Sequence, residues 1–243
     1  MKLNAIILAA GKGTRMKSEM PKCAYPFCGK PMISYLLESC KKAGIENVVC
    51  VLGYKIDEML KILPKDVKYA YQSEQLGTGH AAKCAYDVLK DEEGLTLVFP
   101  GDMPLIDSQT IKDLVTCHIE SQNALTVVTT ILDDPKAYGR IYRENGNVKK
   151  IIEFKDCTEE QKLIKEINVA LYCLDNKLLF EALNGISNNN KANEYYFTDI
   201  IEIIGKDKRV DSFVVENDYR LTGINDLETL VEMERLYLED QKK

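Results

Sequence analysis

A glycine-rich, basic loop near the N-terminus is the segment of this sequence best suited to binding an anion. Residues 8–22 read LAAGKGTRMKSEMPK, with Gly11 and Gly13 among several basic side chains. Glycines allow backbone N–H groups to approach an anion without a Cβ atom in the way. Arg15 can bind phosphate oxygens in a bidentate manner, and Lys22 supplies a movable point charge. These residue types indicate a phosphate-binding loop.

Two common phosphate-binding patterns do not describe this loop. The P-loop pattern needs a hydroxyl after Gly-Lys, but Gly11-Lys12 is followed by Gly13. The pattern G-x-G-x-x-G needs a small residue where Met16 stands. Residues 1–30 carry six Lys and Arg against one acid, within a chain of net charge −6. This basic segment suits either a small anionic ligand or an ordinary solvated surface. The acidic balance of the whole chain argues against nucleic acid as a partner.

The elements that must position this loop follow an alternating pattern of apolar runs and helical segments, which predicts βαβ units and a parallel sheet. We expect strands at 5–10, 47–53, 67–71, 95–99 and 124–132, and helices at 31–42, 55–63, 79–90 and 108–121. Two β-like runs around Asn145-Gly146 predict a hairpin. We interpret residues 135–175, including a strand at EINVALYCL, as an antiparallel, lid-like excursion over one edge of the sheet.

The rest of the sequence completes a doubly wound, mostly parallel α/β fold. Helices are expected at 175–184, at 195–205 and from 226, with a strand at VDSFVV. No repeat or flexible linker interrupts the pattern, so residues 1–243 are predicted to form one domain. Ligands bind such sheets at the carboxyl ends of the strands. The glycine-rich loop and Asp102 both follow predicted strands, and we expect them at that edge.

Several short motifs occur in an order typical of one family of enzymes. They are LAAGKGTRM followed by PK, QSEQLGTGHA (72–81), PGDMPL (100–105), YGRI (138–141), IIEFKD (151–156), EIN (166–168), NEYYFTDII (193–201) and GIND (223–226). Over about residues 4–230 the sequence resembles the sugar-phosphate nucleotidylyltransferases. Within them it is most similar to the uridylyltransferase domain of the bacterial N-acetylglucosamine-1-phosphate uridylyltransferases. The opening motif marks only the superfamily, whereas the ordered set is far more specific.

The resemblance implies a Rossmann-like nucleotidyltransferase fold and a Mg²⁺-dependent reaction. A uridylyl group would pass from UTP to N-acetylglucosamine 1-phosphate, giving pyrophosphate and UDP-N-acetylglucosamine, a precursor of the peptidoglycan cell wall. A phosphate monoester has its second pKa near 6, so the attacking oxygen is already ionised at neutral pH. The reaction therefore needs no general base, and the protein's task is positioning and charge stabilisation.

The resemblance also implies roles for individual residues. Arg15 and Lys22 would be catalytic, and Asp102 and Asn225 would bind Mg²⁺. The nucleotide would contact Leu8, Ala9, Ala10, Gly11, Gly13, Lys22, Gln72, Gly77 and Thr78, with Gln72 and Gly77 reading the uracil. The sugar would contact Gly139, Glu153 and Asn168.

Each of these residues also has a structural interpretation. Asn225, with Glu228 three positions later, resembles a helix N-cap with its capping partner. Asp102 alone could be a turn residue after a strand. His80 and His118 have no obvious partner in the sequence, and we expect both to be structural.

The sequence departs from the family pattern near the expected sugar pocket. Val169-Ala170 replaces a Thr-Gly pair, and Pro100 stands where an aromatic residue is common. Another sugar 1-phosphate, such as glucose 1-phosphate, is therefore an alternative substrate. A nucleotide-sugar-dependent glycosyltransferase is a second alternative, although Pro100 removes the first Asp of its usual Asp-x-Asp metal motif.

The remaining features bear on location and partners. The eight cysteines are scattered without a C-x-x-C pair, and the N-terminus lacks the pattern of a signal peptide. The apolar runs are too short to span a membrane. We expect a reduced, cytoplasmic protein with no membrane or nucleic-acid partner, and the sequence favours no oligomeric state. The family's C-terminal β-helix acetyltransferase domain is built from hexapeptide repeats, and we expect it to be absent because no such repeats occur.

Overall fold

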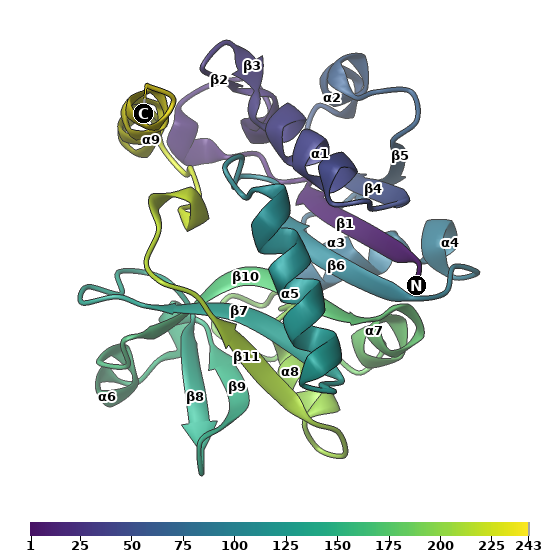
Figure 1. Ribbon diagram of the computed structural model, residues 1–243, viewed down its shortest axis with the longest axis vertical. Helices are drawn as coiled ribbons and strands as arrows, with labels where there is room; N and C mark the ends of the chain where they lie inside the picture. Colours follow the sequence, from purple (N-terminus) through teal and green to yellow (C-terminus); the bar gives the residue numbers. More distant parts are fainter. Residues whose placement is uncertain (243) are drawn as a thin grey trace.

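A nine-stranded sheet runs through the centre of the molecule (Figure 1) in this computed structural model, which describes residues 1–242. Its main path has the order β11-β7-β10-β6-β1-β4-β5. These strands are β1 (Leu3–Ala9), β4 (Asn47–Leu52), β5 (Lys68–Tyr71), β6 (Leu95–Pro100), β7 (Leu125–Ile131), β10 (Glu166–Asp175) and β11 (Val210–Val214). All adjacent pairs on this path are parallel except those that β10 makes with β6 and β7. The predicted mostly parallel α/β fold is confirmed.

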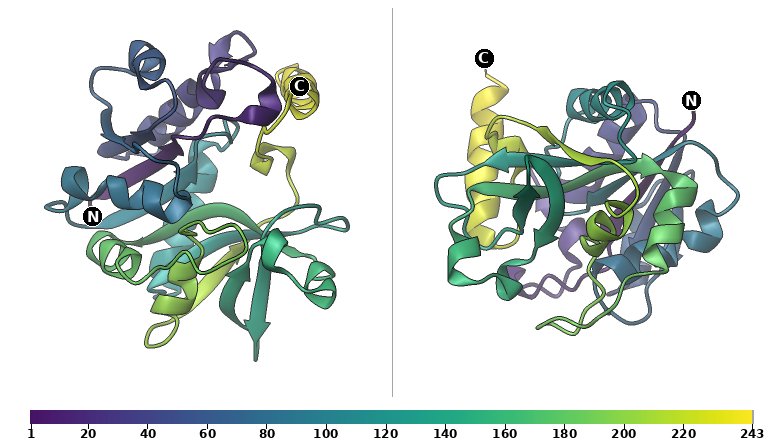
Figure 2. Two further views of the ribbon diagram at one scale, coloured as in Figure 1. Left: turned by 180° about the vertical axis from the view of Figure 1, so that it is seen from behind. Right: turned by 90° about the horizontal axis from the view of Figure 1, so that it is seen from below.

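Helices cover both faces of this sheet. The front in Figure 1 carries α1 (Met32–Lys42), α2 (Ile56–Ile62) and α5 (Ser108–Glu120). The view from behind in Figure 2 shows α3 (Thr78–Cys84), α4 (Tyr86–Leu89), α7 (Asn176–Leu183) and α8 (Asp199–Ile204). Within residues 1–242, none of the helices combines the length and apolar character that a membrane crossing needs.

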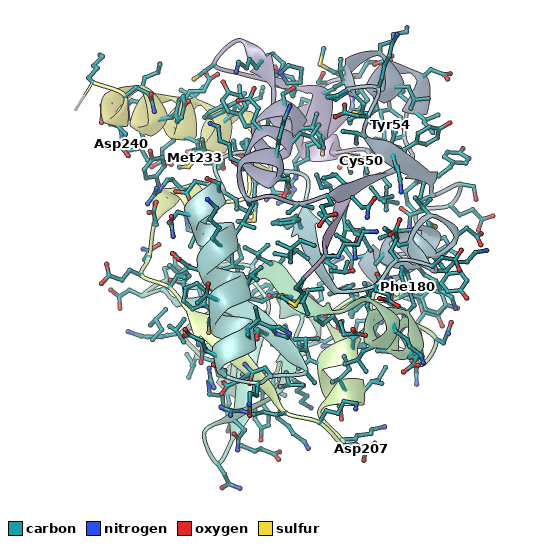
Figure 3. The ribbon with its side chains drawn as sticks, turned by 45° about the vertical axis from the view of Figure 1, so that its right-hand side comes forward. Cys50, Tyr54, Phe180, Asp207, Met233 and Asp240 are labelled. Carbon is teal, nitrogen blue, oxygen red and sulfur yellow. The ribbon has the colours of Figure 1, made fainter. Side chains whose placement is uncertain are left out.

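The alternation of side chains along each strand divides the core into two apolar clusters. Along β1, Ile6 belongs to one cluster, whereas Ala5 and Ile7 belong to the other. Figure 3 labels one member of each, Phe180 of α7 and Cys50 of β4. Because strands of this kind are buried on both faces, they appear in the sequence as continuous apolar runs.

The predicted hairpin is confirmed, but part of the predicted excursion lies elsewhere. The strands β8 (Arg140–Glu144) and β9 (Asn147–Ile152) join through Asn145 and Gly146, both with positive φ. They extend away from the main path of the sheet. The following strand, β10, was expected over an edge of the sheet, and this was wrong: it lies between β6 and β7. Its residues Leu171–Leu174 are buried, and such a run is stable only where both faces are covered.

The C-terminal helix α9 (Leu227–Asp240) packs on the N-terminal part of the chain. Its Leu230 and Met233 join a third apolar cluster with Met16 and Phe27. Phe27 belongs to the short strand β2 (Pro26–Phe27), which pairs with β3 (Lys30–Pro31), and Figure 1 shows this ribbon beside α9. Figure 3 labels Met233 on the helix. This packing brings the segment before α9 against the glycine-rich loop. One further short helix, α6 (Glu159–Lys162), follows the hairpin.

Candidate active site

A cavity of about 510 Å³ opens at the carboxyl edge of the parallel strands. The loop after β1, the residue after β5 and the turn after β6 all contribute to its wall. Parallel strands meet this edge with the same polarity, which is why segments far apart in the sequence converge there. Of the predicted site residues, the cavity is lined by Leu8, Ala9, Ala10, Gly11, Lys22, Gln72, Gly77, Thr78, Asp102, Gly139, Glu153 and Asn168.

At one part of the cavity wall, Gln72 and Gly77 are held together at the start of α3. Gln72 is 3% exposed, and its Nε2 donates to the Gly77 carbonyl at 3.1 Å. The same Nε2 lies 3.0 Å from Nδ1 of His80. Gly77 has a φ of +114°, and a Cβ there would lie 2.5 Å from the Tyr195 carbonyl oxygen. Only glycine fits this position, because both the backbone conformation and the available space exclude a side chain.

The residues predicted to contact sugar share another part of the wall. Thr198 donates its hydroxyl to Glu153 at 3.0 Å, and burial raises the pKa of the Glu153 carboxyl despite this hydrogen bond. Asn168 donates from Nδ2 to the Tyr172 hydroxyl at 2.7 Å and accepts the Ala170 N–H at 2.8 Å. Asn168 stands at an irregularity of β10, where the pairing register with β7 shifts before Tyr172.

The basic loop supplies two cations to a polar cluster made of Arg15, Lys22, Asp102 and Asn225. Lys22 Nζ donates to the Asp102 carboxylate and, at 2.7 Å, to Asn225 Oδ1. Arg15 donates from Nη2 to the same Asn225 oxygen at 2.8 Å. A backbone hydrogen bond also holds the segments of Asp102 and Asn225 together, since the Ile224 N–H donates to the Asp102 carbonyl at 2.8 Å. The structure therefore gathers both predicted catalytic residues and both predicted metal ligands.

The capping interpretation of Asn225 is wrong. The N-cap of α9 is Asp226, whose Oδ1 accepts the Thr229 N–H at 2.9 Å. This hydrogen bond lowers the pKa of the Asp226 carboxyl. The Asn225 side chain is directed to the basic loop instead, where its Oδ1 accepts from Lys22 and Arg15.

The same cluster fits a divalent cation of the Mg²⁺ type. Asp102 and Asn225 direct oxygen atoms at one positively charged group, the Lys22 ammonium. Mg²⁺ prefers oxygen ligands and commonly takes one or two from protein, with phosphates and waters completing its shell. No group of three or more His, Cys, Asp and Glu side chains in residues 1–242 is arranged to hold a metal ion.

Three predicted residues lie outside the wall of this cavity. Arg15 and Asn225 line a neighbouring cavity of about 720 Å³, which shares Ala137 and Tyr138 with the first. Gly13 lies behind Lys22, and a Cβ on Gly13 would be 2.5 Å from the Lys22 Cβ. The absence of a side chain at Gly13 therefore lets Lys22 pack closely on the loop.

The cavity also contains residues that sequence reasoning did not single out. They are Cys23, Gln75, Ala81, Ala137, Tyr138, Tyr172, Glu194, Phe197 and Thr198. Pro100 and Ala170, which the sequence predicted to lie near the sugar pocket, also line the cavity. Tyr138, Glu194 and Thr198 belong to motifs quoted above, but nothing in their residue types marks them as ligand contacts. Burial and the nearby Asp102 carboxylate raise the pKa of the Cys23 thiol to about 12, so this thiol is neutral.

A glycine-rich basic loop, a carboxylate and an amide at one edge of a parallel sheet define an α/β enzyme that handles phosphorylated ligands. The sequence model of the family described as nucleotidyl transferase matches residues 4–238, and the chain belongs to this family. The predicted enzyme class, a nucleotidyltransferase, is thereby confirmed.

Curated relatives agree with this assignment. The chain is 44% identical over 236 residues to the bifunctional protein GlmU of Acholeplasma laidlawii, covering 97% of this chain and 51% of that protein. It is 46% identical over 236 residues to the bifunctional protein GlmU of Thermoanaerobacter pseudethanolicus, covering 96% of this chain and 51% of that protein. The chain thus spans about half the length of the curated relatives it matches.

The fold is shared with solved nucleotidyltransferase structures. A crystal structure of UDP-glucose pyrophosphorylase complexed with UDP-glucose superposes with a TM-score of 0.77 at 21% identity, covering 99% of this chain and 100% of that one. A putative glucose-1-phosphate thymidylyltransferase from Bacillus anthracis gives a TM-score of 0.75 at 19% identity, covering 96% and 94% of the two chains. These similarities concern the fold alone.

Proposed function

We propose that this chain transfers a uridylyl group from UTP to N-acetylglucosamine 1-phosphate, giving UDP-N-acetylglucosamine and pyrophosphate, with Mg²⁺ as the cofactor. The observation that supports this most strongly is the shared cavity. Gln72 and Gly77, expected to read the base, and Glu153 and Asn168, expected to contact the sugar, line one space together with Lys22 and Asp102. Two substrates bound there would have their phosphates near the same basic side chain.

The residues in the cavity suit a direct displacement at the α-phosphorus. The sugar phosphate is its own nucleophile, because its second pKa is near 6. An oxygen of that phosphate forms a bond to the α-phosphorus, and the bond to the pyrophosphate oxygen breaks. Lys22 and Arg15 would stabilise the negative charge that grows on the phosphate oxygens. The backbone N–H groups of the loop at Gly11 would hold the nucleotide phosphates in place.

Asp102 and Asn225 would hold Mg²⁺ together with substrate phosphate oxygens. The bound ion would neutralise phosphate charge. In this proposal Asn225 is oriented by Arg15, since the Arg15 guanidinium donates to its Oδ1 at 2.8 Å.

The experiment that tests the proposal is a pyrophosphate-release assay with a matrix of substrates. UTP, CTP, ATP and GTP are each paired with N-acetylglucosamine 1-phosphate and with glucose 1-phosphate, with and without Mg²⁺. We expect the highest kcat/KM with UTP and N-acetylglucosamine 1-phosphate, and turnover only with the metal. Equal rates with purine triphosphates would contradict the base assignment. A preference for glucose 1-phosphate would overturn the sugar assignment and leave the uridylyl transfer intact.

A further inference from the structure

Two neighbouring groups, the Gly77 carbonyl and the His80 ring, determine which end of the Gln72 side-chain amide faces them. Its Nε2 lies 3.1 Å from the Gly77 carbonyl oxygen, which can only accept. This contact favours the orientation in which the amide nitrogen, and not the amide oxygen, faces Gly77, and the second neighbour adds to it. The second contact of Nε2 is with His80 Nδ1 at 3.0 Å. Since an amide nitrogen only donates, His80 Nδ1 is the acceptor, and the ring carries its proton on Nε2.

These two contacts use both hydrogens of the Gln72 amide. The acceptor that remains is Oε1, which is not among the fully buried, unpartnered side-chain atoms of residues 1–242. Gln72 lines the cavity, so this oxygen is the part of the amide that can meet a ligand. His80 is three residues beyond Gly77 on the first turns of α3 and faces the amide, and its ring centroid lies 6.5 Å from that of Tyr195.

We propose that His80 is a positioning residue for base selection, which acts by fixing the Gln72 amide so that its oxygen faces the base. An amide oxygen accepts from the N3–H of uracil. Cytosine has an unprotonated N3 at the same position, and two acceptors facing each other repel. A reversed Gln72 amide would present N–H to the base and would favour cytosine. His80 thus selects against cytosine, the base that most resembles uracil, without contacting the base itself.

This inference rests on the proposed function, and a pair of substitutions of opposite hydrogen-bonding polarity tests it. In His80→Glu the new carboxylate only accepts, so the Gln72 amide keeps its direction. In His80→Lys the new ammonium only donates, so Gln72 Oε1 turns toward it. Wild type and both variants are assayed for pyrophosphate release with UTP and with CTP, using N-acetylglucosamine 1-phosphate. Circular dichroism melts confirm that each variant is folded.

The measured quantity is the ratio of kcat/KM for UTP to that for CTP. We expect His80→Glu to keep the wild-type ratio to within about threefold and His80→Lys to lower it by about tenfold or more, because a mispaired polar group in a buried site is strongly penalised. Equal ratios in the two variants would overturn the role of His80, while a UTP-preferring wild type would leave the proposed function standing. A wild-type chain that releases no pyrophosphate with UTP would overturn both.

Discussion

Asn225 and Asp226 are adjacent in the sequence, but their side chains form hydrogen bonds with different groups. The Asn225 amide oxygen accepts from Lys22 and Arg15, whereas the Asp226 carboxylate caps α9 through Thr229. Sequence reasoning found the helix start but could not assign the cap, because both residue types are favoured N-caps and either register fits the helix. Only the packing of α9 on the N-terminal segment decides which side chain faces the loop.

The two residues form a matched pair for mutation. Asn225→Ala should lower Mg²⁺-dependent turnover by on the order of 10²-fold and leave the melting temperature unchanged. Asp226→Ala should lower the free energy of unfolding by about 1 kcal/mol and retain turnover. Urea unfolding and pyrophosphate release, measured on both variants, separate the roles. Loss of stability without loss of turnover in Asn225→Ala would contradict the ligand assignment.

Ala170 carries a backbone conformation that alanine rarely adopts. Its φ is +65°, within the β10 irregularity, and its N–H donates to Asn168. A left-handed conformation costs a residue with a Cβ about 1–2 kcal/mol, and glycine avoids this cost. Ala170→Gly should therefore stabilise the fold by about 1 kcal/mol. Ala5→Gly, in the regular strand β1, should destabilise it. Denaturant unfolding of both variants checks this, and a destabilised Ala170→Gly would contradict the strain argument.

At the scale of elements, the sequence predicted the type and order of nearly every long segment. Apolar runs such as AIILA (5–9) predicted strands because both faces of each strand are buried, and Asn145-Gly146 predicted a hairpin because both residues accept positive φ. The placement of β10 could not be predicted. Its apolar run indicates burial, but strand order depends on long-range pairing that no local pattern records.

The helix α8 begins with Asp199, and the titration of its carboxylate should make the stability of the fold depend on pH. Burial, with the nearby charges of Glu202 and Asp156, raises the pKa of Asp199 from 3.8 to about 6. The folded state therefore binds more protons than the unfolded state between these values, and its stability falls as pH rises through this window. Asp199→Asn removes the charge that burial disfavours. Its melting temperature should exceed that of wild type at about pH 8, and by less at about pH 5. An equal difference at both pH values would contradict the assignment.

At the scale of the whole molecule, the site joins segments that are far apart in the sequence. Lys22, Asp102 and Asn225 meet only because β1, β6 and the α9 packing converge at one edge. The resemblance of the ordered motifs to the nucleotidylyltransferase family predicted this set, because a family resemblance carries information about three-dimensional structure that residue types alone do not. The hydrogen bonds that orient other residues of the cavity, from Thr198 to Glu153 and from Gln72 to His80, could not be predicted, because each depends on side chains brought together by the fold.

The central claim is that an oxygen of a sugar phosphate bound in the same cavity attacks the uridylyl phosphorus and is retained in the new bond. The most direct test uses UTP with N-acetylglucosamine 1-phosphate whose terminal phosphate oxygens are labelled with ¹⁸O, followed by mass spectrometry of both products. Attack of the sugar phosphate on the α-phosphorus predicts that all of the label remains in UDP-N-acetylglucosamine and that the pyrophosphate is unlabelled. Label in the pyrophosphate, or no labelled UDP-N-acetylglucosamine, would contradict the claim.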